Sequence, residues 1–177
     1  SDILDKLELA RRRYFIVSLH REENVDCRER LKTLLVTLNR LSERYGYPVI
    51  VSTHPRTRNR MESISGLTIN DSVRFMKPFG FHDYNNLQMN SYCAISDSGT
   101  IAEEASILGF PAITPRDSIE RPEGLDVGCI MMTGLDRNTI ENGVEMVTGL
   151  FEERQAQRID QPVPDDYMIA NTSDRVA

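Results

Sequence analysis

Apolar residues occur along this chain in short runs, separated by longer segments in which they recur every three or four positions. The short runs are rich in β-branched and aromatic residues, which is typical of buried strands. They predict six strands, at residues 14–19, 48–52, 73–76, 93–96, 111–114 and 129–132. Between the first two runs, five leucines at helical spacing predict a helix over 28–45 that ends at Gly46.

Further helical segments separate most of the remaining strands. They are predicted at residues 84–91, 99–108, 121–126 and 136–153. Gly109 is suited to end the second of these, and Asp136 is suited to cap the last. Strands that alternate with helices predict a doubly wound, Rossmann-like α/β fold with a parallel sheet, and 177 residues suffice for one such domain.

Three segments have no clear pattern. Residues 1–10 are interpreted as a helix end or a linker, and the polar residues 56–66 as a loop with a short helical turn. The polar tail after Gln155 is either a packing arm or loose chain.

Composition excludes several function classes. A net charge of -6 argues against nucleic-acid binding, which requires a basic face. No apolar run reaches the roughly 18–20 residues that span a bilayer, so no membrane association is expected. Three widely spaced cysteines without a CxxC pair favour a reducing, cytoplasmic compartment, and Cys93 and Cys129 are interpreted as buried residues. The fingerprints of dinucleotide-binding, P-loop and α/β-hydrolase proteins are absent.

The candidate chemistry begins where the fourth predicted strand ends. Asp97, Ser98, Gly99 and Thr100 join that strand to helix-forming sequence. Such a turn places free backbone N–H groups at the positive end of a helix dipole, where an anion such as phosphate can bind. Glu104 lies one turn later and could meet a ribose hydroxyl, although it could equally be an ordinary exposed helix residue. The pattern therefore predicts a nucleotide-type ligand.

Other strand ends also carry polar residues. His20 and His54 occupy equivalent positions after the first two strands and could contact phosphate or sugar, or titrate near neutral pH. They lack a third metal-ligating partner, so we expect neither a metal nor another cofactor. Arg116 and Arg121 follow the fifth strand and suit phosphate contacts, or structural ion pairs with neighbouring carboxylates.

An aromatic cluster follows the third strand. Phe79, Phe81 and Tyr84 could flank a flat base or could form part of the core, and the sequence leaves both interpretations open.

Taken together, the polar blocks at the strand ends resemble, in order and spacing, those of the bacterial UDP-N-acetylglucosamine 2-epimerase family. The blocks are His20-Arg21-Glu22-Glu23-Asn24, Ser52-Thr53-His54-Pro55, Asp97-Ser98-Gly99-Thr100-Ile101-Ala102-Glu103-Glu104 and Arg116-Asp117-Ser118-Ile119-Glu120-Arg121-Pro122-Glu123. The resemblance implies a two-domain glycosyltransferase-B architecture, of which this chain is the C-terminal, UDP-binding half. We therefore expect residues 1–177 to form a single domain that lacks the N-terminal catalytic partner domain.

The resemblance also implies roles for individual residues. Ser98, Gly99 and Thr100 would hold the diphosphate, Glu104 the ribose, and Arg121 the phosphate side. His20 matches an active-site histidine near the pyrophosphate, and Phe79 and Tyr84 fall where the uracil is lined. His54 and Arg116 match looser positions in the same site.

The activity implied is non-hydrolysing epimerisation of a UDP-N-acetylhexosamine by loss and re-addition of UDP, in surface polysaccharide biosynthesis. The acid and base groups of that family lie in the N-terminal half, so this chain alone is expected to be inactive. The full protein is expected to be a homodimer. Alternatives are a hydrolysing 2-epimerase, a non-catalytic UDP-sugar-binding domain and a retaining glycosyltransferase.

The chain departs from the common family pattern at two places. It has Thr100 where common members have glycine, and Ser118-Ile119 where they usually have small polar residues. The stretch Leu87-Gln88-Met89-Asn90 and the sequence around Thr100 are closer to the capsule and O-antigen branch. Enzymes of that branch convert UDP-2-acetamido-2,6-dideoxy-L-talose to UDP-N-acetyl-L-fucosamine. We slightly favour this branch.

Overall fold

A computed structural model shows a parallel sheet of six strands in the order β3-β2-β1-β4-β5-β6. It describes residues 1–21, 24, 26–53, 55–62, 64, 66–117, 130–160, 162–164 and 167. The strands are β1 (Phe15–Ser18), β2 (Val49–Ser52), β3 (Val73–Met76), β4 (Cys93–Ser96), β5 (Ala112–Thr114) and β6 (Ile130–Met132). All six strands predicted from the sequence are present, and the doubly wound α/β fold is confirmed.

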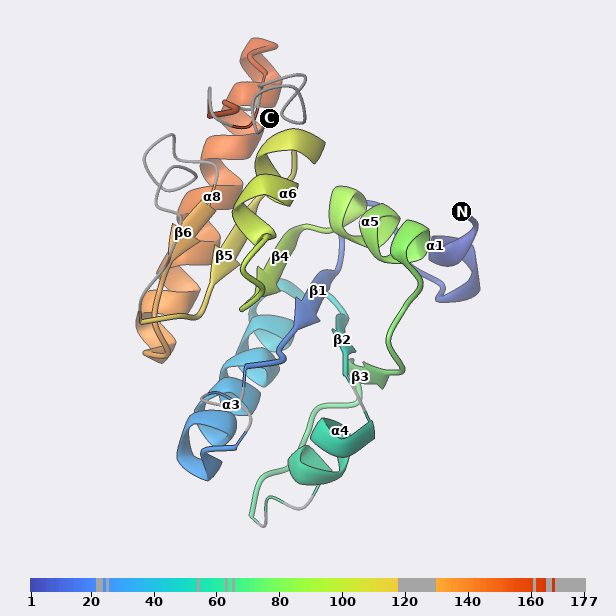
Figure 1. Ribbon diagram of the computed structural model, residues 1–177, viewed down its shortest axis with the longest axis vertical. Helices are drawn as coiled ribbons and strands as arrows, with labels where there is room; N and C mark the ends of the chain where they lie inside the picture. Colours follow the sequence, from blue (N-terminus) through green and yellow to red (C-terminus); the bar gives the residue numbers. More distant parts are fainter. Residues whose placement is uncertain are drawn as a thin grey trace, which may run out of the picture.

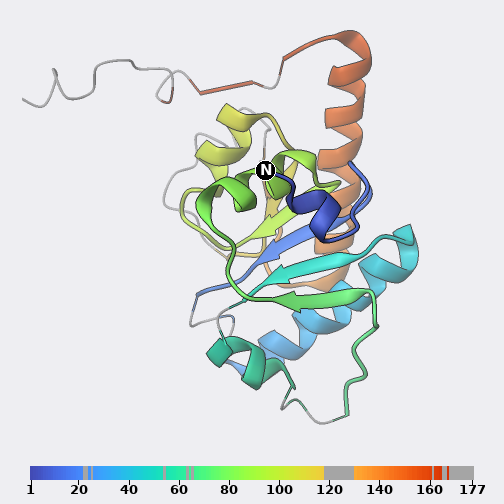
Figure 2. The same cartoon turned by 90° about the vertical axis from the view of Figure 1, so that its right-hand side faces the viewer.

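Helices cover both faces of this sheet (Figures 1 and 2). The described helices are α1 (Ile3–Lys6), α3 (Arg28–Tyr45), α4 (Pro55–Glu62), α5 (Phe81–Asn90), α6 (Ile101–Leu108) and α8 (Arg137–Gln157). Helices α3 and α8 pack on one face, whereas α1, α5 and α6 lie on the other. No helix in the described part of the chain is both long enough and apolar enough to cross a membrane.

Alternation along β1 builds a separate core on each face. Phe15 and Val17 point toward α3 and α8, where they pack with Leu34 and other apolar residues. Tyr14 and Ile16 point the opposite way, into the core beneath α5 and α6. A strand buried on both faces is apolar throughout, which explains why its sequence shows a continuous hydrophobic run.

The structure corrects one expectation and extends two others. Residues 55–62 form helix α4 and not the predicted loop, because Met61 at the end of this otherwise polar helix packs with Leu31 and Leu35 of α3. Helix α5 begins three residues earlier than predicted, and α8 continues to Gln157. The helix predicted over 121–126 and the buried Cys129 lie outside the described residues, whereas Cys93 is buried as expected.

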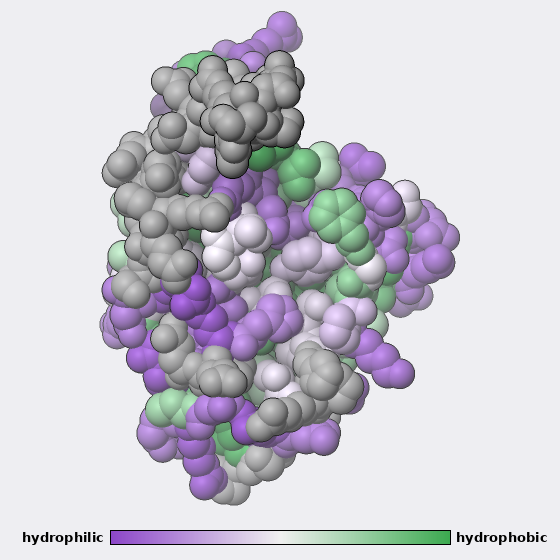
Figure 3. Space-filling view, in the orientation of Figure 1, coloured by the Kyte–Doolittle hydropathy of each residue, from purple (hydrophilic) through white to green (hydrophobic). Residues whose placement is uncertain are grey.

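The surface on the α5 and α6 side mixes hydrophilic and hydrophobic groups (Figure 3). Phe81 and Met89 of α5 and Ile107 of α6 are the large apolar side chains that these two helices expose. In the coloured part of this face, hydrophobic groups lie among hydrophilic ones and form no single continuous apolar patch (Figure 3).

Alanine substitutions at two glycines of α8 are expected to have opposite effects on stability. A Cβ at Gly143 would lie 2.5 Å from Thr133 Cγ2 and 3.3 Å from Met131 Sδ, whereas a Cβ at Gly149 would meet no heavy atom within 4 Å. We expect Gly143→Ala to lower the free energy of unfolding by about 1–3 kcal/mol through overpacking. Gly149→Ala should raise it by about 0.5–1 kcal/mol, because alanine favours the helix. Urea denaturation of both variants measures the difference, and shifts in the same direction would contradict this packing of α8 on the sheet.

Candidate functional site

The carboxyl ends of β1 and β4 lie side by side at the centre of the sheet, with Ser18 paired in register with Ser96. The chain leaves β1 toward α3 on one face and leaves β4 toward α6 on the other. Ligands of doubly wound sheets bind in the crevice between two such diverging connections. His20 follows β1 and residues 97–100 follow β4, so the fold brings together the two polar segments that the sequence singled out.

Asp97 joins the two connections. It is fully buried, and its carboxylate accepts hydrogen bonds from the backbone N–H groups of His20 and Arg21, at 2.9 and 3.1 Å, and from the side-chain amide of Asn24, at 3.0 Å. The Arg21 guanidinium donates to the Asp97 carbonyl at 3.1 Å. Hydrogen bonds to a buried carboxylate are strong, and removing the carboxylate leaves the buried donors unpaired. Asp97 therefore holds the backbone at His20 beside the turn at 98–100.

The imidazole of His20 is oriented by the end of its own strand. His20 Nε2 lies 2.7 Å from the hydroxyl of Ser18, which is buried, while His20 itself is exposed. A hydroxyl can donate or accept, so this contact fixes the ring without excluding either neutral tautomer. The histidine is thus held at the carboxyl end of β1, beside the end of β4.

Two backbone N–H groups of the turn at 98–100 have partners within the chain, since that of Ser98 donates to Ser96 Oγ at 3.2 Å and that of Thr100 donates to Ser98 Oγ at 3.3 Å. The N–H groups that can meet a ligand are therefore those that follow, in the first turn of α6. Thr100 is the N-cap of α6, but its side chain makes no capping hydrogen bond. Asp136, at the start of α8, by contrast accepts from the backbone N–H of Thr139. These Asp136 contacts with Thr139 lower the pKa of the Asp136 carboxyl. The first-turn N–H groups of α6 thus have neither an intrahelical partner nor a Thr100 cap, which suits them to an anion.

Gly99 sits at the most open point of the turn. A Cβ added there would meet no heavy atom within 4 Å, and the residue is not among those with positive φ. Neither packing nor backbone conformation within the described structure therefore requires glycine at this position. The open space lets a ligand approach the backbone closely.

Glu104 projects from the first turn of α6 and is held at both carboxylate oxygens. Thr100 Oγ1 donates to Oε1 at 2.7 Å, and Gln88 Nε2 of α5 donates to Oε2 at 2.7 Å. Sequence reasoning identified Glu104 but assigned no role to Gln88. The feature of the sequence that could have drawn attention to Gln88 is its polar side chain directly after Leu87, which is buried in the structure.

The aromatic residues of the third crossover divide between core and surface. Tyr84 and Phe79 are partly buried and pack against the core beneath α5 and α6. Burial raises the pKa of the Tyr84 hydroxyl to about 12, with the side chains of Ser18 and Ser96 acting in the opposite direction. Phe81, in contrast, is 75% exposed. Phe79 and Tyr84 therefore contribute to the core, which is one of the two interpretations that the sequence left open.

Three further residues were singled out by the sequence, namely Arg116, His54 and Arg121. Arg116 directly follows β5 and is buried, 2% exposed, with its carbonyl accepting from the N–H of Gly134. Asp117, a candidate ion-pair partner of Arg116, forms an ion pair with Arg30 at 2.8 Å. His54 and Arg121 lie outside the described residues.

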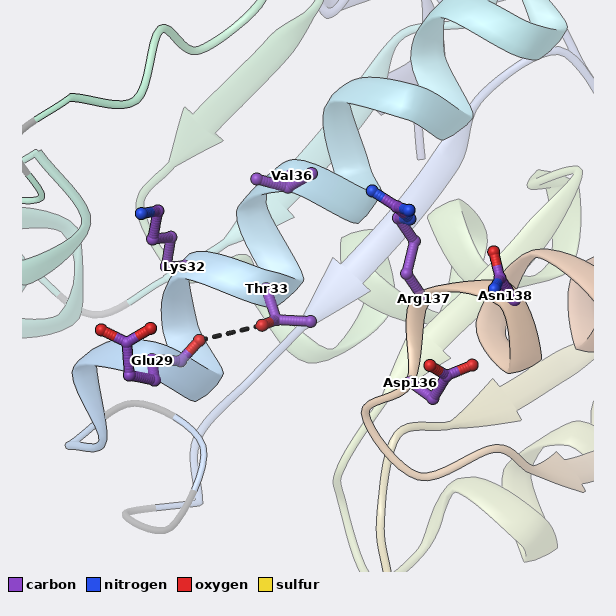
Figure 4. Close-up of a pocket in the computed structure, with 7 residues that line it drawn as sticks. All are labelled: Glu29, Lys32, Thr33, Val36, Asp136, Arg137 and Asn138. Carbon is purple, nitrogen blue, oxygen red and sulfur yellow. Dashed lines mark hydrogen bonds between the residues drawn. The ribbon is translucent and has the colours of Figure 1, made fainter.

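A separate pocket of about 360 Å³ lies between α3 and the start of α8 (Figure 4). It is lined by Glu29, Lys32, Thr33, Val36, Asp136, Arg137 and Asn138. The two cations of this lining are balanced by two carboxylates, and none of its residues belongs to the segments 19–27 and 97–100 that connect β1 to α3 and β4 to α6. The charge balance does not favour an anionic ligand. The better candidate for an anion site is the switch point, where the chain leaves the neighbouring strands β1 and β4 toward opposite faces of the sheet.

The chain is similar to known proteins over its whole length. Residues 1–177 match a model of the family described as UDP-N-acetylglucosamine 2-epimerase. The UDP-N-acetylglucosamine 2-epimerase of Methanococcus maripaludis is 38% identical over 136 residues, which cover 75% of this chain and 37% of the relative.

Two solved structures show the same fold. The UDP-N-acetylglucosamine 2-epimerase of Rickettsia bellii superposes with a TM-score of 0.76 and 44% identity, over 84% of this chain and 39% of that one. The UDP-GlcNAc 2-epimerase of Methanocaldococcus jannaschii, in complex with UDP-GlcNAc and UDP, superposes with a TM-score of 0.70 and 36% identity, over 76% and 38%. The chain thus spans about two fifths of the length of the relatives it matches.

Proposed function

The chain belongs to the UDP-N-acetylglucosamine 2-epimerase family, and on that premise we propose that it binds the UDP portion of a nucleotide sugar at the switch point between β1 and β4. The observation that carries the proposal is the turn at Ser98, Gly99 and Thr100, where the start of α6 has no side-chain cap from Thr100. One relative of similar fold has been solved with UDP-GlcNAc and UDP, which supports a ligand of this class.

The diphosphate is assigned to the turn. The N–H groups of the first turn of α6 supply donors, Ser98 lies beside them at the start of the turn, and Gly99 leaves the backbone open to a phosphate. Arg121 would add charge on the phosphate side, and Arg116, at the end of β5, is a second candidate. Since the net charge of the chain is -6, attraction of the anion has to be local.

The nucleoside is assigned to the side of the crevice formed by α5 and α6. Glu104 would accept hydrogen bonds from the ribose, and Phe79 and Tyr84 would flank the uracil. His20, held by Ser18 and Asp97, would lie near the pyrophosphate, and His54 is a further candidate there. Each assignment extends a resemblance in sequence, and that of His20 is supported by its contacts with Ser18 and Asp97 at the ends of β1 and β4.

The reaction proposed for the full protein is 2-epimerisation without net hydrolysis. A base removes the proton at C2 of the sugar, the C1–O bond breaks, and UDP leaves with the bonding electron pair. UDP then adds again to the glycal-type intermediate, while a proton returns to C2 from the opposite face. In this scheme the chain binds the leaving group and stabilises its charge, and the remainder of the protein supplies the proton-transfer groups.

The complete protein is proposed to be a two-domain, glycosyltransferase-B type homodimer that acts in surface polysaccharide biosynthesis. Its substrate would be UDP-N-acetylglucosamine or UDP-2-acetamido-2,6-dideoxy-L-talose. The chain itself would form one UDP-binding domain, which agrees with the two fifths of its relatives' length that it spans.

We expect the 177-residue chain to bind UDP and to leave UDP-N-acetylglucosamine unchanged. Calorimetry with UDP should give a dissociation constant below about 1 mM, and proton NMR of UDP-N-acetylglucosamine incubated with the chain should show no 2-epimer. Absence of UDP binding would refute the binding site. Appearance of the 2-epimer would refute the assignment of the proton-transfer groups to the rest of the protein.

A further inference from the structure

The carboxylate of Glu104 is oriented before any ligand binds. Its Oε1 accepts from Thr100 Oγ1 and its Oε2 accepts from Gln88 Nε2, both at 2.7 Å. The two donors come from opposite sides, one from the N-cap of α6 and the other from α5. Each carboxylate oxygen has two lone pairs, so each retains one acceptor site after these contacts.

Gln88 is an unusual residue to find at this position. It is fully buried beside Leu87, and its amide oxygen accepts no hydrogen bond from the part of the chain that the structure describes. A buried amide with an unpaired oxygen costs stability that an apolar residue would not. The hydrogen bond from its side-chain nitrogen to Glu104 explains why a polar residue stands here despite this loss of stability.

The Thr100 hydroxyl extends the arrangement toward the turn. It lies 3.0 Å from Ser98 Oγ. Because a hydroxyl carries one proton and that of Thr100 is donated to Glu104, Ser98 is the donor to Thr100. A chain of hydrogen bonds thus links the proposed diphosphate end of the site with Glu104.

Thr100 and Gln88 are twelve positions apart in the chain, yet they meet on one carboxylate. Glycine at position 100 would remove one of the two contacts. The two residues are therefore parts of a single structural feature.

We propose that Gln88 and Thr100 are positioning residues that fix the Glu104 carboxylate so that its two free acceptor sites match the vicinal hydroxyls of a ribose. This inference rests on the proposed function, in which Glu104 contacts the ribose. It assigns to the pair a role in specificity: the site selects a ribonucleoside diphosphate over its 2′-deoxy analogue, because the deoxy compound leaves one oriented acceptor site unused.

The test compares UDP with 2′-deoxy-UDP by calorimetry. The protein should bind UDP more tightly by about tenfold, the value of one hydrogen bond to a charged acceptor. Gln88→Met and Thr100→Val, which conserve volume, should each reduce that ratio at least threefold. Gln88→Met should do so while affinity for 2′-deoxy-UDP stays the same. Thr100→Ser should keep the wild-type ratio, and so should Thr148→Val, a buried control on α8 whose hydroxyl donates to the Val144 carbonyl.

The Glu104→Gln variant distinguishes failure of the positioning role from failure of the proposed ribose contact. If it abolishes the preference for UDP while Gln88→Met and Thr100→Val keep the wild-type ratio, the positioning role is refuted and the ribose contact stands. If Glu104→Gln keeps the wild-type ratio, the ribose contact is itself refuted, together with the positioning role. Thr100 is exposed, so its variant remains informative even where Gln88→Met fails to fold.

Discussion

Asp97→Ala is expected to lower the free energy of unfolding by about 3 kcal/mol, the usual cost of breaking a buried, hydrogen-bonded charged group. The substitution removes the acceptor of three hydrogen bonds, from the backbone of His20 and Arg21 and from the side chain of Asn24. These donors are buried or partly buried, so water replaces the lost acceptor only in part. Urea denaturation measures the change.

The same variant should weaken UDP binding, because the connection after β1 loses its attachment to the connection after β4. Asp117→Ala is the matched control. Asp117 follows the neighbouring strand β5 and pairs with Arg30, but its side chain is 65% exposed, so its removal should change stability by less than about 1 kcal/mol. Equal losses in the two variants would contradict the role assigned to Asp97.

Gly99→Val is expected to lower UDP affinity at least tenfold, or about 1.4 kcal/mol, with the fold intact. The reason is the open space above Gly99, where a Cβ would meet no heavy atom of the described chain within 4 Å. A side chain there disturbs nothing in the protein itself but occupies the place proposed for the diphosphate. Calorimetry with UDP and thermal denaturation, run on the same samples, separate the two effects.

Gly149→Ala serves as the control for this substitution, since Gly149 is equally open but lies on α8, away from the crevice. It should leave UDP affinity unchanged. If Gly99→Val binds UDP as tightly as the wild-type chain, the diphosphate does not lie against this turn, and the site has to be assigned elsewhere.

Most of the fold could be predicted from the pattern of apolar residues. The strands are buried on both faces and therefore appear as short continuous apolar runs, and α3 follows the leucine spacing from Arg28 to Tyr45. Helix α4 was missed because it is polar at most positions and is anchored near its end by Met61. That tertiary contact has no periodic signal in the sequence.

The site was predictable in part. The carboxyl-edge location of His20 and of the 98–100 turn follows from the order of strands and polar blocks. The contacts that orient these groups could not be predicted, since they join residues far apart in the chain. Asp97 reaches the connection after β1, Gln88 reaches Glu104, and neither distance is encoded in a local motif.

These orienting contacts have a common consequence. The residues proposed to meet the nucleotide are held by buried partners that belong to the strand ends and to α5. A site held in this way spends less binding free energy on ordering side chains when the ligand arrives. The domain is thus suited to hold UDP both as part of the substrate and as the departed leaving group.

An NMR titration of the isotope-labelled chain with UDP tests the central claim most directly. The account predicts that the largest changes in backbone amide shifts occur at Ser98, Gly99, Thr100 and Ile101, with smaller changes at His20 and Glu104. It predicts no change at Lys32, Thr33 or Asn138, which line the pocket between α3 and α8. Changes centred on that pocket, with the turn at 98–100 unaffected, would contradict it.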